Sequence, residues 1–183
     1  MTAVTELLDS IRGELSRFDR PVVADLEQPG HPADELRRLL GDLPEEVTDW
    51  FSWCNGTRRR PGQTVGDVAF IPGYIFPSAE EAREVRRLGF PDLDALGEWI
   101  PILLSASSDL YAAVWKEDEF VGVAGVVEGA DTEIEFLTVE EMLRVQLAAY
   151  TGGAYFLEEG ELEVDDDLLD GVYRQVTGRE PLY

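Results

Sequence analysis

Four short segments in the middle of the chain constrain its fold most, because each carries the residue pattern of a β-strand. Turn-forming clusters separate them, and connections this short imply antiparallel hairpins. The run Glu133-Ile134-Glu135-Phe136 shows the strict alternation of a half-buried strand. An earlier segment, Val65 to Ile71, looks like a further strand. The four segments are Trp99 to Leu104, Leu110 to Lys116, Phe120 to Val127 and Glu133 to Leu137.

Helical patterns lie on both sides of these strands. The first is an apolar stripe at spacings of three and four, which predicts an amphipathic helix. Pro44 suits the first turn of a later helix, and Asn55-Gly56 suits its end. Capping boxes at Ser78 with Glu81 and at Thr138 with Glu141 begin two more. The expected helices span residues 4–18, 33–40, 44–54, 78–88, 138–152 and 164–176.

This order of elements predicts the α+β class. We expect a mainly antiparallel sheet of about five to six strands with helices packed on one face. The chain has 183 residues, which suits one good-sized domain, and no linker divides it. Residues 1–183 are therefore expected to form a single domain.

Several short motifs together resemble the SUKH superfamily, in its Smi/Knr-type branch. The similarity runs from about Leu36 to Tyr155. It leaves out the N-terminal helix and connection (residues 1–32) and the acidic C-terminal extension with its helix (residues 156–183). The motifs are Leu43-Pro44 before a helix with Trp50 and Phe51 that Asn55-Gly56 ends, then Phe70 to Gly73, Phe76 to Ala82, Trp99 to Ile102 and Phe136 to Leu143.

The resemblance implies a SUKH-like α+β fold without catalytic machinery. Bacterial members are widely taken to be immunity proteins that bind and neutralise toxins, often nucleases, and a fungal relative is a regulatory hub in cell-wall synthesis. We therefore expect a non-catalytic protein-binding module, first as an immunity protein whose partner is a basic toxin domain. The alternative is a regulatory scaffold of the cell-wall regulator type, and an acidic hydrolase is a third, less favoured possibility.

The charge of the chain narrows its partners. It has 38 acidic and 15 basic residues, a net charge of −23. Nucleic-acid binding needs Lys and Arg to neutralise phosphates, so we expect no nucleic-acid partner. Anionic lipid is equally disfavoured, whereas a basic protein would associate quickly. Residues 116–183 carry 18 acids and 4 bases, a net of −14, and so hold most of the excess.

The predicted partner-binding residues are an acidic run and two aromatic anchors. The run has eight acids and no base within thirteen residues, which is more than helix capping needs. The alternative explanation is that these acids stabilise the N-terminal turn of a helix and make the surface more soluble. Trp53 is either a core residue beside Trp50 or a partly exposed anchor. The predicted residues are Glu158, Glu159, Glu161, Glu163, Asp165, Asp166, Asp167, Asp170, Trp53 and Tyr74.

Candidates for catalysis and metal binding are weak. The single His31 lies in a connection rich in proline and glycine, where an exposed loop histidine is expected. The single Cys54 lies on the apolar side of its helix, as a buried, inert thiol does. Asp165-Asp166-Asp167 lacks the spacing of a calcium loop. We therefore expect no catalytic residue, no metal and no cofactor.

Two further expectations concern location and the basic loop. The N-terminus has no uninterrupted apolar stretch, no segment approaches the length of a membrane span, and a single cysteine agrees with a reducing compartment. We expect a cytoplasmic protein with no membrane partner. The basic loop Arg58-Arg59-Arg60 either pairs with the acidic run or is a solvated surface loop.

Overall fold

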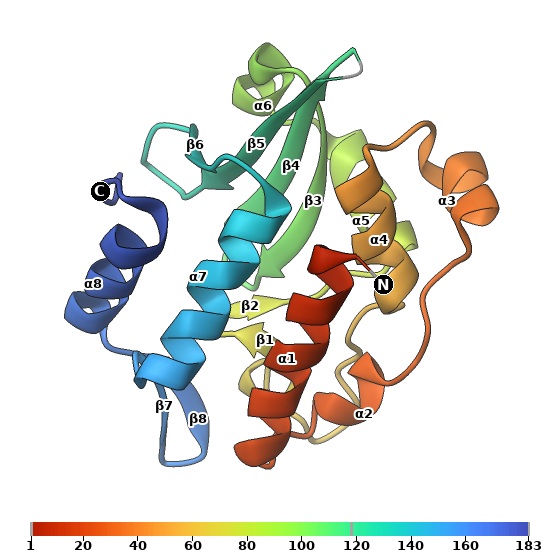
Figure 1. Ribbon diagram of the computed structural model, residues 1–183. Coiled ribbons are helices and arrows are strands. Elements are labelled where there is room, and N and C mark those ends of the chain that lie inside the picture. Colours follow the sequence, from red (N-terminus) through yellow and green to blue (C-terminus); the bar gives the residue numbers. More distant parts are fainter. Residues whose placement is uncertain (1, 118, 183) are drawn as a thin grey trace.

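The computed structural model describes residues 2–117 and 119–182, and its centre is one antiparallel sheet. The six strands pair in chain order, each with its sequence neighbours, and the sheet is strongly curled (Figure 1). This confirms the α+β class and the antiparallel sheet. The strands are β1 (Ala69–Ile71), β2 (Tyr74–Ile75), β3 (Glu98–Ser105), β4 (Leu110–Lys116), β5 (Glu119–Val126) and β6 (Glu133–Phe136).

The four predicted central strands appear with ends within one residue of the predicted ones. The strand expected at residues 65–71 is partly wrong. Its first half forms a 3-10 turn, Gly66–Val68, and only Ala69–Ile71 pairs in the sheet. The Pro72-Gly73 turn, with Gly73 at a φ of 78°, reverses the chain after β1. The two residues of β2 then pair with β1 on one side and with β3 on the other.

Helices cover both faces of the sheet, so the expectation that they pack on one face is wrong. On one face a large core joins residues from α1, α4, α7 and the sheet. On the other face α6 and the end of α5 cover a smaller core around Leu93 and Trp99. The helices are α1 (Ala3–Arg17), α2 (Val23–Leu26), α3 (Ala33–Leu40), α4 (Glu45–Trp53), α5 (Ala79–Leu88), α6 (Pro91–Leu96), α7 (Val139–Gly152) and α8 (Asp166–Thr177).

The N-terminal helix is part of the core. Leu8, Ile11 and Leu15 of α1 are fully buried, and α1 packs against α7 and α4 (Figure 1). Within the described residues, no helix is both long and apolar enough to cross a membrane.

A second, small sheet lies between α7 and α8. Its strands, β7 (Tyr155–Glu158) and β8 (Glu161–Val164), form an antiparallel hairpin that the sequence patterns above do not include. The hairpin delays the last helix: α8 begins at Asp166 and not at Val164, because Val164 still pairs with Tyr155 and Asp165 caps the helix by accepting from the Leu168 N–H. Thus α8 stands beside α7, at the edge of the molecule (Figure 1).

Candidate functional site

The acidic run folds into the hairpin and the first turns of α8. Glu159 and Gly160 form its two-residue turn, with φ values of 52° and 90°. This is the type I′ geometry that matches the twist of a hairpin. A Glu-Gly pair between Tyr155-Phe156-Leu157 and Leu162-Glu163-Val164 is the sequence signal that would have located the hairpin.

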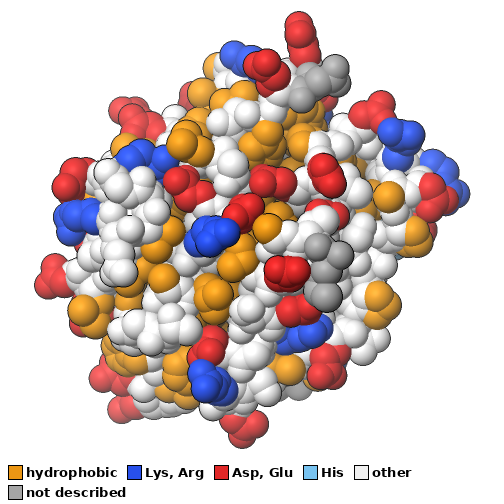
Figure 2. Space-filling model, in the orientation of Figure 1, with side chains coloured by type: hydrophobic (Ala, Val, Ile, Leu, Met, Phe, Trp, Pro, Cys, Tyr) orange, Lys and Arg blue, Asp and Glu red, His pale blue; other side chains and the backbone are white. Residues whose placement is uncertain are grey.

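The hairpin places acidic side chains opposite one another. Glu158 pairs in register with Glu161, and Glu163 lies opposite Phe156 on the same face. Like charges directly opposite each other destabilise a strand pair. Six of the eight acids are exposed, all except Glu161 and Asp170. Figure 2 shows acidic side chains along the edge of the molecule that α8 and the hairpin form.

Few of these charges are neutralised within the protein. Asp170 lies 3.6 Å from Arg174, and the Thr64 hydroxyl donates to Glu161 over 3.3 Å. Among the described residues, no Lys or Arg forms an ion pair with Glu158, Glu159 or Glu163. The run therefore leaves most of its negative charge facing solvent.

A buried arginine links the hairpin to the 3-10 turn that precedes β1. Arg20, only 6% exposed, donates to the carbonyl oxygen of Gly160 over 2.5 Å and to that of Gly66 over 2.6 Å. Both acceptors lie in turns, and charged donors make the stronger class of hydrogen bond. The position of the acidic hairpin thus depends on a residue that lies far from it in the sequence.

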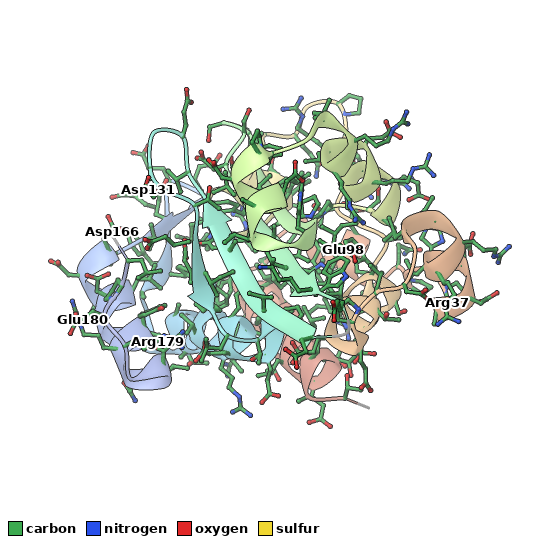
Figure 3. The ribbon with its side chains drawn as sticks, turned by 90° about the horizontal axis from the view of Figure 1, so that it is seen from above. Arg37, Glu98, Asp131, Asp166, Arg179 and Glu180 are labelled. Carbon is green, nitrogen blue, oxygen red and sulfur yellow. The ribbon has the colours of Figure 1, made fainter. Side chains whose placement is uncertain are left out.

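A cavity of about 220 Å³ opens where the hairpin and α8 meet the main sheet. It brings together two predicted residues, Tyr74 from β2 and Asp166 from α8. Figure 3 shows Asp166 on the α8 side of the molecule, opposite Arg37 of α3. The other polar residues in the wall are Tyr111, Glu135, Gln146, Tyr155 and Tyr173.

Glu135 reaches the cavity because β6 contains a β-bulge. Ile134 pairs with Ala124 and Phe136 with Val123, so Glu135 has no partner of its own on β5. A bulge turns two consecutive side chains to the same side. Ile134 accordingly packs in the smaller core and Phe136 in the larger one. The expectation of strict alternation, with Glu135 facing outward, is therefore wrong.

The environment of Glu135 disfavours its charge. Burial raises the pKa of the Glu135 carboxyl to about 7, and a hydrogen bond with Tyr111 opposes this rise without cancelling it. Among the described residues, no Lys or Arg forms an ion pair with this carboxyl group. Burial likewise raises the pKa of Tyr74 to about 12, with Asp109 and Glu135 adding to the effect. The cavity thus contains a carboxyl group whose pKa is raised to about 7, beside Tyr74 and Tyr111, whose pKa values burial raises further above neutrality.

The other tyrosines and Gln146 are held by hydrogen bonds. The Tyr155 hydroxyl bonds to the side-chain oxygen of Gln146, which is buried in α7. The Tyr173 hydroxyl donates to the backbone oxygen of Glu135 over 2.7 Å and ties α8 to the bulge. These bonds fix the ring positions before any ligand arrives.

Trp53 does not belong to this site. Its indole N–H donates to Asp9 of α1 over 2.9 Å, and the Arg12 guanidinium lies 5.4 Å from its ring centre. The ring also packs against the main core while remaining partly exposed. Helix α4 lies across α1 and α7 from α8 (Figure 1), so Trp53 and the acidic run are on different sides of the protein.

The remaining candidates differ in outcome. Cys54 is buried as predicted, and burial raises the pKa of its thiol to about 11. His31 is not exposed as predicted: its side chain is 18% exposed and lies between Glu35 at 3.3 Å and Glu80 at 3.0 Å. Within the described part of the chain, no group of three or more His, Cys, Asp or Glu is arranged to hold a metal ion.

The basic loop is a surface loop, as one of its two expected alternatives had it: Arg58, Arg59 and Arg60 are all exposed, and among the described residues none of them forms an ion pair with the acidic run. The Arg60 guanidinium lies 2.6 Å from the Asp25 carboxylate of α2, and the Arg58 backbone N–H donates to the same carboxylate over 3.1 Å. Asp25 is buried, with 6% exposure, so this pair organises the loop and not the acidic run.

Comparison with known proteins adds no relative. No family model matches the chain, and no curated protein matches it significantly. The resemblance to the SUKH superfamily therefore stays a prediction.

Proposed function

We propose that the protein is a non-catalytic binding module for a basic protein, and that its partner is a toxin domain that it neutralises. One observation carries this proposal: the acidic run forms a single exposed edge, where Glu158 lies opposite Glu161 and, among the described residues, no Lys or Arg forms an ion pair with either. Such an arrangement costs stability in the free protein. A basic partner would remove that cost on binding.

The resemblance to immunity proteins supports a toxin as the partner. A nuclease needs a basic groove for phosphates, and an acidic edge complements such a groove. Long-range attraction between the two would speed association, and salt would slow it because it screens exposed charges. A regulatory scaffold would use the same edge for several partners of moderate affinity.

The hydrolase alternative has one observation in its favour, the carboxyl group of Glu135 with its pKa near 7 inside a cavity. Asp166, the other carboxylate in the cavity wall, would have to act with it. The cavity is smaller than the usual 300–1,000 Å³ of small-molecule sites. We therefore favour binding over hydrolysis.

The test is to co-express the chain with the product of the adjacent open reading frame. We expect rescue of growth and elution of the two proteins as one complex. A triple variant, Glu158→Lys, Glu159→Lys and Glu163→Lys, should lose both effects. The matched control reverses three exposed acids outside the run, Glu27, Glu119 and Glu128. It changes the net charge equally and should retain both.

Two results would contradict the proposal. Equal protection by the two triple variants would remove the electrostatic mechanism. Absence of any toxic neighbour, together with several moderate-affinity partners in a pull-down, would favour the scaffold.

A further inference from the structure

The cavity beside α8 has the chemistry of a cation site. Among the described residues that line it, none is Lys, Arg or His, while Glu135 and Asp166 are both acidic. An anionic ligand would meet only carboxylates and uncharged groups there. An uncharged apolar ligand would leave the partly buried Glu135 carboxyl group with its hydrogen bond to Tyr111 but no compensating cation.

Aromatic rings form a continuous wall around this carboxyl group. Tyr74 and Tyr111 have ring centres 5.1 Å apart, Tyr111 and Phe136 are 6.1 Å apart, and Phe136 and Tyr173 are 5.7 Å apart. All three pairs are tilted, with interplanar angles of 50° to 58°. Tilted rings present electron-rich faces in several directions, and such faces attract a cation within about 6 Å of a ring centre.

We propose that this cavity binds an alkylammonium group, the end of a lysine side chain that the basic partner inserts between the sheet and α8. The inference rests on the proposed function, which supplies the basic partner. The acidic run would bring that partner to the site. The ammonium group would contact the Glu135 carboxylate, and its methylene chain would lie against the tyrosine rings.

The size of the cavity agrees with this occupant. The volume of about 220 Å³ lies below the range of about 300–1,000 Å³ that is usual for small-molecule sites. The end of a single side chain suits such a space better than a nucleotide or an oligosaccharide does. Asp166 belongs to the acidic run and also lies in the cavity wall. Its negative charge would therefore attract a cation from the run toward the cavity.

Two features of the sheet serve to hold the carboxyl group in place. The bulge in β6 turns Glu135 inward, and Gly125 of β5 leaves room for it. Among the residues that the structure describes, no Lys or Arg forms an ion pair with the carboxyl group there, and burial raises its pKa to about 7. A group kept at a cost to stability is a feature expected at functional or strained sites. A bound ammonium would lower this pKa, so binding should release a proton near neutral pH.

The experiment is a chemical-shift titration of the full chain with N-acetyl-lysine methylamide. The uncharged isostere N-acetyl-norleucine methylamide serves as the reference ligand. We expect the lysine probe to perturb resonances of the cavity tyrosines and to bind at least about tenfold more tightly than the isostere. Equal binding of the two probes, or no perturbation at the cavity, would overturn the inference.

Two variants assign the effect to the carboxyl group. Glu135→Gln should weaken binding of the lysine probe by about tenfold or more, while Glu133→Gln, on the same strand, should leave it within about twofold. Gly125→Ala keeps the carboxyl group but displaces it, and should weaken binding in the same way. Unchanged affinity in both Glu135→Gln and Gly125→Ala would contradict the assignment.

Affinity for the lysine probe should rise between about pH 5.5 and about pH 8, as Glu135 ionises. The groups around Glu135 are the cavity residues Tyr111, Tyr74, Tyr155, Tyr173 and Asp166, the neighbouring Glu133, and Arg179. The Arg179 guanidinium donates to the Glu135 backbone oxygen over 3.0 Å and forms its ion pair with Glu141, not with the Glu135 carboxyl group. Burial raises the pKa of Tyr74 and Tyr111, so both stay uncharged over this range. The Asp166→Asn and Glu133→Gln variants should keep the pH dependence, and Glu135→Gln should lose it.

Failure of this inference differs from failure of the proposed function. If a basic partner binds the wild type and Glu135→Gln equally and the lysine probe does not bind, the cavity site is wrong and the acidic edge remains. If the probe binds as expected but no basic protein does, the amine site stands and the proposed partner is wrong.

Discussion

The Glu135 carboxylate lies directly over Gly125 of the neighbouring strand, so that a Cβ at position 125 would stand 1.7 Å from Oε1. The Glu135 side chain in this position leaves no room for a Cβ at position 125. The glycine, the bulge and the buried carboxyl group form one local arrangement in β5 and β6. Substitutions in this arrangement should change both the stability and the binding properties of the protein.

Replacing Glu135 by Gln should stabilise the protein above neutral pH. The folded pKa is raised from 4.5 to about 7, so the folded state retains a proton that the unfolded state loses. Wild-type stability from this group is therefore fully present below about pH 4.5, falls as pH rises, and levels off above about pH 7. The variant should gain about 1–3 kcal/mol at about pH 8 and little at about pH 4.5.

Urea unfolding of the two proteins at both pH values measures the difference. The comparison isolates Glu135 from Glu46, whose pKa burial also raises. An equal difference at the two pH values would contradict the assigned pKa.

Replacing Gly125 by Ala should displace the Glu135 carboxyl group but change the free energy of unfolding only slightly. The atom that the new Cβ meets is the end of a flexible Glu side chain, which can rotate toward solvent. We expect a change in unfolding free energy within about 1 kcal/mol, with loss of the near-neutral titration of Glu135 by NMR. A matched Gly152→Ala variant, where nothing lies closer than 3.8 Å, should keep that titration.

Replacing Arg20 by Met should loosen the hairpin. The change removes two charged hydrogen bonds to the Gly66 and Gly160 carbonyl oxygens. We expect destabilisation by about 2–4 kcal/mol. Hydrogen exchange of the amides in β7 and β8 should rise more than that in β3 and β4. The exposed Arg17→Met, which pairs with Glu14 on the surface, is the control and should cost less than about 1 kcal/mol.

The Cys54 thiol should be unreactive in the folded protein. The residue is fully buried, and burial raises its pKa to about 11, so little thiolate exists at about pH 8. Labelling by a thiol reagent should therefore follow the rate of unfolding and become fast in denaturant. Rapid labelling of the native protein would contradict this burial.

Much of the fold was predictable from local patterns. The segments that became β3, β4, β5 and β6 carry enough apolar, turn-bounded residues to locate each strand, and capping boxes locate the starts of α5 and α7. The hairpin β7–β8 was missed because its strands are dominated by acids, although the Glu159-Gly160 turn is a recognisable signal.

The candidate site was predictable only in part. The sequence predicts Tyr74 as an aromatic anchor and Asp166 as part of the acidic run, and the structure brings the two residues to one cavity. Trp53 is also predicted as an anchor and lies elsewhere, against Asp9 and Arg12. The alternation of residues 133–136 predicts an outward-facing Glu135, which is wrong because a bulge is a property of two paired strands and leaves little trace in the sequence of one of them.

The sequence by itself determined the α+β class, the antiparallel order of the central strands and the concentration of negative charge near the C-terminal end, since these depend on neighbouring residues and on composition. Only the tertiary structure decided which faces α6 and α8 cover, where Arg20 fastens the hairpin and which side Glu135 faces. Those outcomes depend on contacts between residues far apart in the chain, whose packing free energies no local pattern contains.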